Sequence, residues 1–143
     1  MSEPKYLLDV NVLIALTDSS HVHHQLVNKW FGNGSFNWGV CAFSEAGFLR
    51  VSTNPRLRGY SLEQATAILA EFTRSPGYCF WGMTRGWASL SAPFTGRVFG
   101  HQQITDAYLL GLAVQENGVL VTLDRAFKYM AGEQWGKNLF VLE

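Results

Sequence analysis

An aspartate separates a strand-like run from a helix-like run in Tyr6-Leu7-Leu8-Asp9-Val10-Asn11-Val12-Leu13-Ile14-Ala15-Leu16. The apolar residues before Asp9 are typical of a short buried strand, and the residues after it predict a short helix from about Val12 to Leu16. A carboxylate between two apolar elements is costly unless something compensates its charge. The stretch therefore predicts a strand–helix unit of an α/β domain, with a functional acid at the junction.

The remainder of the chain alternates short apolar runs with helical periodicity. These patterns predict strands at residues 37–41, 78–81, 119–121 and 139–142, and helices at residues 22–31, 43–51 and 125–130. Ser61-Leu62-Glu63-Gln64 has the form of a capping box, and Thr105 is expected to be the N-cap of another helix. Residues 82–103 predict only one helical turn, near Trp87. This alternation predicts an α/β fold with a parallel sheet in one domain, residues 1–143.

Composition excludes several classes of protein. Hydrophobic residues make up 48% of the 143 residues and charged residues 15%, so the chain is apolar enough to fold around a core. Residues 1–5 lack the pattern of a signal peptide, and Val10–Leu16, the most apolar stretch, is too short to span a bilayer. Cys41 and Cys79 lie in apolar runs and are expected to be buried free thiols. We therefore expect a cytoplasmic protein without a membrane partner.

Three more carboxylates lie at element boundaries. Glu45 falls in the first turns of a predicted helix, Asp106 lies at the start of another, and Asp124 follows the strand at 119–121. Because the carboxyl ends of parallel strands meet at one edge of a sheet, we expect these acids to converge with Asp9. Clustered carboxylates repel one another, and Mg²⁺ or Mn²⁺ prefers such oxygen ligands. The sequence therefore predicts a metal site built from all four acids.

The alternative is that these acids are helix caps and solvated loop residues, which is a reasonable explanation for any single one. Convergence of all four favours a metal site that activates water and neutralises a phosphodiester during RNA cleavage. Asn11, Thr105 and Thr122 are expected to orient the ligands or the water. Removing the four acids from the 11 acidic residues leaves 7 against 11 basic residues, which is compatible with modest, salt-dependent RNA affinity.

Four motifs resemble those of PIN-domain nucleases. They are Leu7–Leu16 around Asp9, Phe43–Val51 around Glu45 with Thr53-Asn54-Pro55 after it, Gly100–Leu110 around Asp106, and Val121–Phe127 around Asp124. Their order and spacing are similar to those of the VapC branch, the ribonuclease toxins of toxin–antitoxin pairs.

The resemblance implies a three-layer α/β/α fold with a mostly parallel sheet. It also implies an Mg²⁺- or Mn²⁺-dependent endoribonuclease that hydrolyses RNA with a metal-activated water. The partners implied are a second copy of the chain in a homodimer and a VapB-type antitoxin. An arginine of such an antitoxin commonly reaches into the acidic pocket.

Cationic and aromatic side chains provide further candidates for RNA contacts. Arg85, Arg97, Arg125 and Lys128 are candidates for phosphate binding, as is the local group Arg50, Arg56 and Arg58, with a solvated surface as the alternative. Trp87, Phe94 and Phe99 are candidates for base stacking or for an antitoxin groove. His21, His23 and His24 lack a third well-spaced ligand, so a polar helix start is favoured over a zinc site.

Other functions are less compatible with these motifs. A phosphatase of the haloacid dehalogenase type needs a second aspartate two residues after the first, where this chain has Asn11. A phospho-receiver needs an acidic pair before the phosphorylated aspartate and a lysine after a late strand, and neither is evident. A PIN-domain nuclease that processes RNA outside a toxin–antitoxin pair stays an alternative, as does a non-catalytic binding module. The sequence leaves open the RNA target, the number of metal ions and the identity of the antitoxin.

Overall fold

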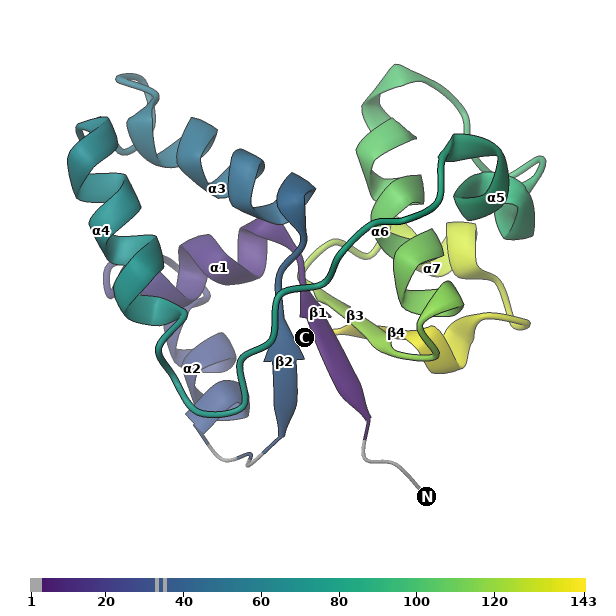
Figure 1. Cartoon of the computed structure of the whole chain (residues 1–143), viewed down its shortest axis with the longest axis horizontal. Coiled ribbons are helices and arrows are strands. Elements are labelled where there is room, and N and C mark those ends of the chain that lie inside the picture. Colours follow the sequence, from purple (N-terminus) through teal and green to yellow (C-terminus); the bar gives the residue numbers. More distant parts are fainter. Residues whose placement is uncertain (1–3, 33, 35) are drawn as a thin grey trace.

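Four short parallel strands form the centre of the molecule in a computed structural model that describes residues 4–32, 34 and 36–143 (Figure 1). The strands are β1 (Lys5–Leu8), β2 (Asn37–Gly39), β3 (Val119–Thr122) and β4 (Leu139–Val141), and their order is β2-β1-β3-β4. Leu7 of β1 lies opposite Gly39 of β2 on one side and Leu120 of β3 on the other. The chain thus places β2 on one side of β1 and β3 on the other, and in parallel sheets ligands typically bind at the carboxyl ends of strands at such a switch point.

Helices cover both faces of this sheet. They are α1 (Val10–Thr17), α2 (His24–Gly32), α3 (Ala42–Thr53), α4 (Leu62–Phe72), α5 (Trp87–Ser91), α6 (Ile104–Gln115) and α7 (Phe127–Ala131), with short 3₁₀ turns at Ala92–Phe94, His101–Gln103 and Gly136–Asn138. In Figure 1, α1–α4 lie to the left of the sheet and α5–α7 to the right. The architecture is the α/β/α arrangement expected from the sequence, with a parallel sheet as its middle layer.

Alternating strand residues supply the two cores between these layers. Adjacent residues of a strand point to opposite faces of the sheet. Leu7 and Leu120 accordingly pack with buried residues of α6 and α7, whereas Leu8 and Val121 pack with buried residues of α1 and α3. Strands buried on both faces explain why the runs before Asp9 and Asp124 are continuously apolar.

Several local expectations are confirmed. Ser61 and Gln64 form the reciprocal hydrogen bonds of a capping box at the start of α4. Cys41 and Cys79 are free thiols as expected, but only Cys41 is buried, and the expected burial of Cys79 is wrong because its side chain is exposed. No helix within the described residues combines the length and apolar character needed to cross a membrane. The expectation about residues 1–5 falls largely on residues 1–3, which lie outside the described part of the chain.

Two expectations about secondary structure are wrong. Residues 78–81 form no strand. This segment is a loop that runs along the edge of β2, and only Tyr78 and Trp81 form isolated parallel bridges, to Trp38 and Cys41 respectively. Helix α6 begins at Ile104 with Gln103 as its N-cap, so Thr105 lies inside the first turn. The chain enters α6 from a 3₁₀ turn, in which the Gln103 N–H already donates to the Gly100 carbonyl, and this replaces a side-chain cap.

Candidate metal and catalytic site

Asp9 is the most enclosed of the four predicted acids. Its backbone N–H extends the sheet by donating to the Val121 carbonyl at 3.0 Å, and its side chain then caps α1. One carboxylate oxygen accepts from the Val10 N–H at 2.7 Å and the other from the Thr122 hydroxyl at 2.7 Å. The residue is only 7% exposed. Burial raises the pKa of Asp9, and the two hydrogen bonds offset part of this increase.

Thr122 and Asn11 connect Asp9 to the loop that carries Asp124. The Thr122 hydroxyl oxygen accepts from the Asn11 side-chain amide at 3.4 Å and from the Asp124 N–H at 3.1 Å. The side-chain Oδ1 of Asn11 in turn accepts from the Leu123 N–H at 3.2 Å. These contacts hold the ends of β1 and β3 together, so that Asp124 emerges beside Asp9. Asn11 and Thr122 therefore lie where the sequence predicts orienting groups.

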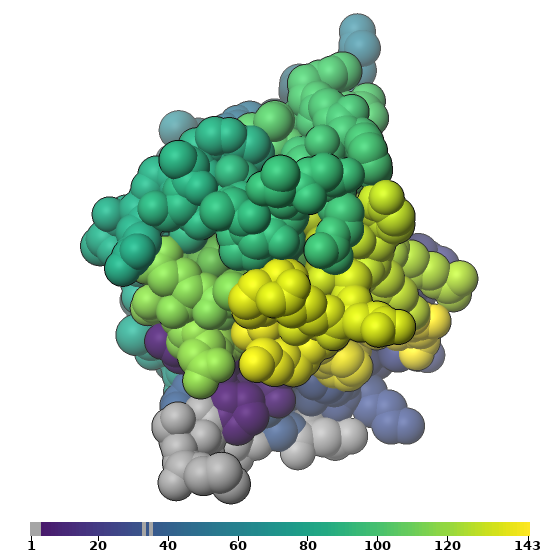
Figure 2. Space-filling view, turned by 90° about the vertical axis from the view of Figure 1, so that its right-hand side faces the viewer, coloured from purple at the N-terminus to yellow at the C-terminus, as the bar shows by residue number. Residues whose placement is uncertain are grey.

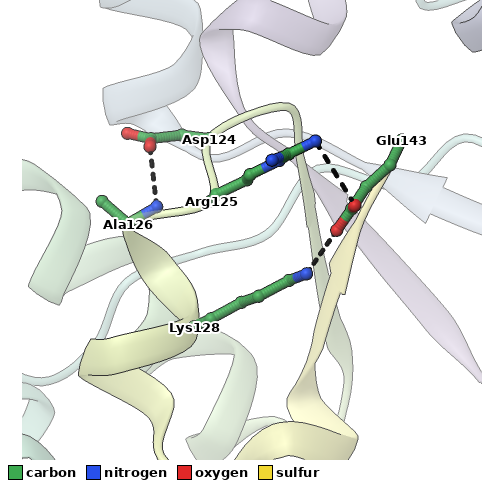
Figure 3. A network of polar contacts seen from close by, with 5 residues as sticks. All are labelled: Asp124, Arg125, Ala126, Lys128 and Glu143. Carbon is green, nitrogen blue, oxygen red and sulfur yellow. Dashed lines mark hydrogen bonds and ion pairs between the residues drawn. The ribbon is translucent and has the colours of Figure 1, made fainter.

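Asp124 occupies a turn of its own. One of its carboxylate oxygens accepts from the Ala126 N–H at 2.9 Å, and Figure 3 shows this contact between β3 and α7. The residue is exposed. A carboxylate that is fixed through one oxygen and open to solvent can reach a ligand with the other.

Asp106 shares an electrostatic field with these two acids. It lies in the first turn of α6, where it is half-buried. Burial and then the charges of Asp9 and Asp124 raise the pKa of Asp106 to about 7. The charge of Asp124 also raises the pKa of Asp9. The fold thus brings three of the four predicted acids within electrostatic range of one another.

Glu45 is not among the charges that shift the pKa of Asp9 or Asp106. It lies in the first turn of α3 and is half-buried. Its charge contributes, after burial, to a raised pKa of Tyr78. The helix is placed close to the site because Gly47 lets α3 approach α1: a Cβ there would lie 2.4 Å from a methyl group of Val10.

The donor chemistry of the trio fits a hard divalent cation. Within the described residues, no group of three or more histidine, cysteine, aspartate or glutamate side chains has converged closely enough to form a ready-made metal cage. Mg²⁺ does not require such a cage, because it is typically held by one or two carboxylates together with water and substrate phosphate. The pKa values of Asp9 and Asp106 are raised first by burial and then by neighbouring carboxylates, and no cation is among the causes. A cation between these carboxylates would remove that electrostatic cost.

The remaining predicted residues have varied environments. Thr105 is exposed on α6 and makes no side-chain hydrogen bond in the described part of the chain, so its orienting role stays a prediction.

Arg125 pairs with Glu143 at 3.6 Å, and Lys128 also pairs with Glu143 (Figure 3). The Lys128 hydrogen bond and the nearby cationic charges hold the pKa of Glu143 below its usual value. Arg97 donates to the Ala131 carbonyl at 3.3 Å, whereas Arg85 is exposed.

Arg58 is a structural residue. Its guanidinium donates to the hydroxyl and the carbonyl of Thr17 at 3.3 Å each, and to the Ser52 hydroxyl at 3.2 Å. It also lies 4.7 Å from the centre of the Tyr60 ring. The group joins the end of α1 to the loop after α3, which favours a structural role over phosphate binding.

His21 and His24 each contact the backbone of the chain. Nδ1 of His24 lies 2.7 Å from the Ala15 carbonyl, and Nδ1 of His21 accepts from the His23 N–H, as expected for a polar helix start.

Phe94 is fully buried and cannot stack on a nucleic-acid base. Phe99 is exposed and stacks on Tyr129, a residue that the sequence analysis did not identify. An aromatic residue in a short helix carries no sequence signal that distinguishes a surface role from a core role.

Comparison with known proteins gives the same assignment. A profile of the PIN domain matches residues 6–133. Ribonuclease VapC39 of Mycobacterium tuberculosis is 41% identical over 123 residues, which is 84% of this chain and 88% of the relative. Ribonuclease VapC44 of the same organism is 38% identical over 127 residues, 87% of this chain and 89% of the relative.

A solved structure is similar in fold. It is VapBC2 from Rickettsia felis bound to a DNA fragment from their promoter, which is 15% identical and has a TM-score of 0.64, with 97% of this chain and 99% of that chain covered. The site geometry, the matched profile and the full-length relatives agree. The chain therefore belongs to the PIN-domain family, within the group of VapC ribonucleases.

Proposed function

We propose that this chain is a divalent-metal-dependent endoribonuclease and the toxin of a toxin–antitoxin pair. The single observation that supports it best is the coupled trio of Asp9, Asp106 and Asp124, delivered to one edge of the sheet by separate elements. Relatives named as VapC ribonucleases cover most of the chain and support RNA as the substrate. The Rickettsia felis VapBC2 structure supports a VapB-type antitoxin as the partner. We further propose one cytoplasmic PIN domain over residues 1–143 that acts as a homodimer.

Asp9 and Asp106 are the proposed principal ligands of Mg²⁺ or Mn²⁺, with Asp124 and Glu45 completing the acidic set. The chemistry that a bound divalent ion supplies is activation of a water nucleophile and neutralisation of charge on the scissile phosphodiester. Thr122 and the Val10 N–H orient the Asp9 carboxylate through its two hydrogen bonds. Asp106, whose pKa is raised to about 7, must give up its proton to act as a ligand.

Asparagine substitution tests the assignment, because it preserves the shape of the side chain and removes its charge. We expect Asp9→Asn and Asp106→Asn each to lower cleavage of single-stranded RNA more than about 100-fold in Mg²⁺ or Mn²⁺. Chelation by EDTA is expected to abolish cleavage by the unmodified protein. Product analysis on a gel measures the rate, and circular dichroism checks that each variant is folded.

Asp18→Asn is the matched control, since Asp18 hydrogen-bonds Ser20 at the end of α1 and belongs to no coupled set of acids. It should cleave RNA at the unmodified rate. Glu45→Gln is expected to cause a smaller loss than the two principal substitutions, because Glu45 is not among the charges that raise the pKa of Asp106. Undiminished cleavage in both Asp9→Asn and Asp106→Asn would refute the proposed site.

A further inference from the structure

Two aromatic rings stack on each other while most of their surface faces solvent. The rings of Phe99 and Tyr129 lie 5.6 Å apart with planes inclined by 30°. Phe99 is 67% exposed and Tyr129 is 60% exposed, so their packing on each other hides less than half of either side chain. Exposed apolar surface of this kind often marks a binding site.

The surrounding contacts hold the pair in place before any ligand arrives. The Phe99 N–H donates to the Gln103 side-chain oxygen at 2.7 Å, which closes the loop that leads into α6. Arg97 donates to the carbonyl of Ala131 at the end of α7, the helix that carries Tyr129. On the face drawn in Figure 2, the green segment around residue 100 lies against the yellow C-terminal part of the chain. The backbone segments that carry the two rings are therefore fixed by two separate hydrogen bonds.

The position of the pair connects it to the acidic trio. Phe99 lies in the segment that enters α6, whose first turn carries Asp106. Tyr129 lies in α7, which begins at Phe127 shortly after Asp124. The stacked rings thus bridge the two chain segments that deliver these acids.

The charges beside the rings favour an anionic polymer. Arg125 and Lys128 are close to Tyr129 in sequence and both pair with Glu143, and Asp124 adjoins Arg125, so these four charges balance and the excess positive charge comes from Arg97. Arg97, on the Phe99 side, contacts a neutral carbonyl. Aromatic rings beside cations that bind phosphate are the usual composition of a site for single-stranded nucleic acid.

We propose that Phe99 and Tyr129 form a base-stacking subsite that holds one nucleotide of single-stranded RNA beside the acids. The inference rests on the proposed function, because it assigns the rings to the same RNA substrate. A base stacks on the exposed faces of the rings, and the neighbouring cations contact the flanking phosphates. Stacking of this kind tolerates any base, so the subsite positions the strand without selecting a sequence.

The test measures binding without cleavage. A short single-stranded RNA with one 2-aminopurine, titrated in EDTA, reports stacking by loss of 2-aminopurine fluorescence and affinity by anisotropy. We expect Phe99→Ala and Tyr129→Ala each to bind about 5- to 100-fold more weakly and to lose the quenching. Tyr129→Phe keeps the ring and should keep both signals. An RNA with an abasic site at the probe position should bind the unmodified protein as weakly as Phe99→Ala does.

Phe80→Ala is the matched control, because Phe80 is 48% exposed and lies beside β2, away from the acids. It should bind RNA as the unmodified protein does. The dependence of affinity on salt should have the same slope in Phe99→Ala, since no phosphate contact is removed. A thermal melt of each variant checks that the loop substitution has not unfolded the chain.

Three outcomes would overturn the subsite: unchanged binding in both alanine variants, equal weakening by Phe80→Ala, or conversion of dimers to monomers by the alanine substitutions. The last outcome would show that the rings contact a second copy of the chain. The proposed function is tested separately by cleavage with Mg²⁺. If the unmodified protein quenches the probe but never cleaves RNA, the stacking subsite is supported and the proposed nuclease activity is refuted. If Phe99→Ala binds and cleaves RNA normally, the nuclease activity is supported and the subsite is refuted.

Discussion

At the scale of single residues, the protonation state of Asp106 is the property with the largest consequences. Its pKa is raised to about 7 by burial and by the charges of Asp9 and Asp124. An unperturbed aspartate has a pKa near 3.9. Between these two values the folded chain holds a proton that the unfolded chain has released. Near neutral pH, a metal ion and a proton therefore compete for the same carboxylate.

We predict that the metal-free protein loses stability as pH rises from about 4 to about 7. In this range the folded state binds more protons than the unfolded state, so raising the pH favours unfolding, and the effect levels off above pH 7. The difference between pH 5 and pH 8 is expected to be about 1 to 2 kcal/mol, allowing for solvent screening of a half-exposed group. Urea unfolding in EDTA at a series of pH values measures it.

Asp106→Asn is the informative comparison for this pH dependence, because asparagine does not titrate. The variant should be more stable than the unmodified protein at pH 8 and close to it at pH 5. Parallel stability curves for the two proteins across this range would contradict the origin we assign to the effect.

At the scale of elements, two helical glycines set how closely neighbouring helices approach. A Cβ on Gly47 of α3 would lie 2.4 Å from a Val10 methyl group of α1, and a Cβ on Gly111 of α6 would lie 2.1 Å from the Leu90 carbonyl oxygen of α5. The first contact involves the end of a side chain, whereas the second involves backbone. The two helix pairs therefore differ in how they can accommodate an added methyl group.

We predict that Gly47→Ala destabilises the protein by about 1 kcal/mol, since overpacking of about 1 to 3 kcal/mol exceeds the gain of about 1 kcal/mol in helix propensity. Adding Val10→Ala should restore most of that loss, because it removes the methyl group that clashes. A double-mutant cycle in urea measures the coupling. Strictly additive effects of the two substitutions would show that the α1–α3 contact is not the cause.

Gly111→Ala is expected to cost more, about 2 to 3 kcal/mol, because no side-chain truncation can relieve a clash with the Leu90 carbonyl. The same urea experiment provides the measurement. Destabilisation no larger than that of Gly47→Ala would contradict the backbone contact described for α5 and α6.

Element boundaries show where local sequence patterns were sufficient. The capping box at Ser61 was predicted and is present, since both of its hydrogen bonds join residues that are close in sequence. Thr105 was predicted as a cap and is not one, because a preceding 3₁₀ turn had already started the helix. The segment at 78–81 resembles a strand in composition, but only two of its residues meet β2 as isolated bridges.

At the scale of the whole molecule, the sheet joins the two halves of the site. Asp9 comes from the N-terminal part of the chain, and Asp106 and Asp124 come from the C-terminal part. The contact between β1 and β3 brings them together. A metal ion held between these acids would therefore stabilise the assembled fold more than any fragment of it.

We predict that Mn²⁺ raises the midpoint of thermal unfolding by several degrees at pH 8 and by less at pH 6, where the Asp106 proton competes with the ion. An ion present at one hundred times its Kd adds about 2.7 kcal/mol of stability. Removing the ion with EDTA should reverse the shift, as followed by circular dichroism. An equal shift in Asp106→Asn would place the ion elsewhere in the molecule.

The sequence by itself determined the strand–acid–helix units, the parallel α/β class and the positions of Asp9, Asp106 and Asp124 at element ends. Those features are encoded by the periodicity and polarity of neighbouring residues, so no distant contact is needed to recognise them. Only the tertiary structure decided that the charges of Asp9, Asp106 and Asp124 act on one another, while the charge of Glu45 acts on Tyr78. It also decided that Arg58 is an internal connector and that Phe99 meets Tyr129. Such pairings depend on strand order and on how closely helices approach, and these arise from packing between segments that are far apart in the chain.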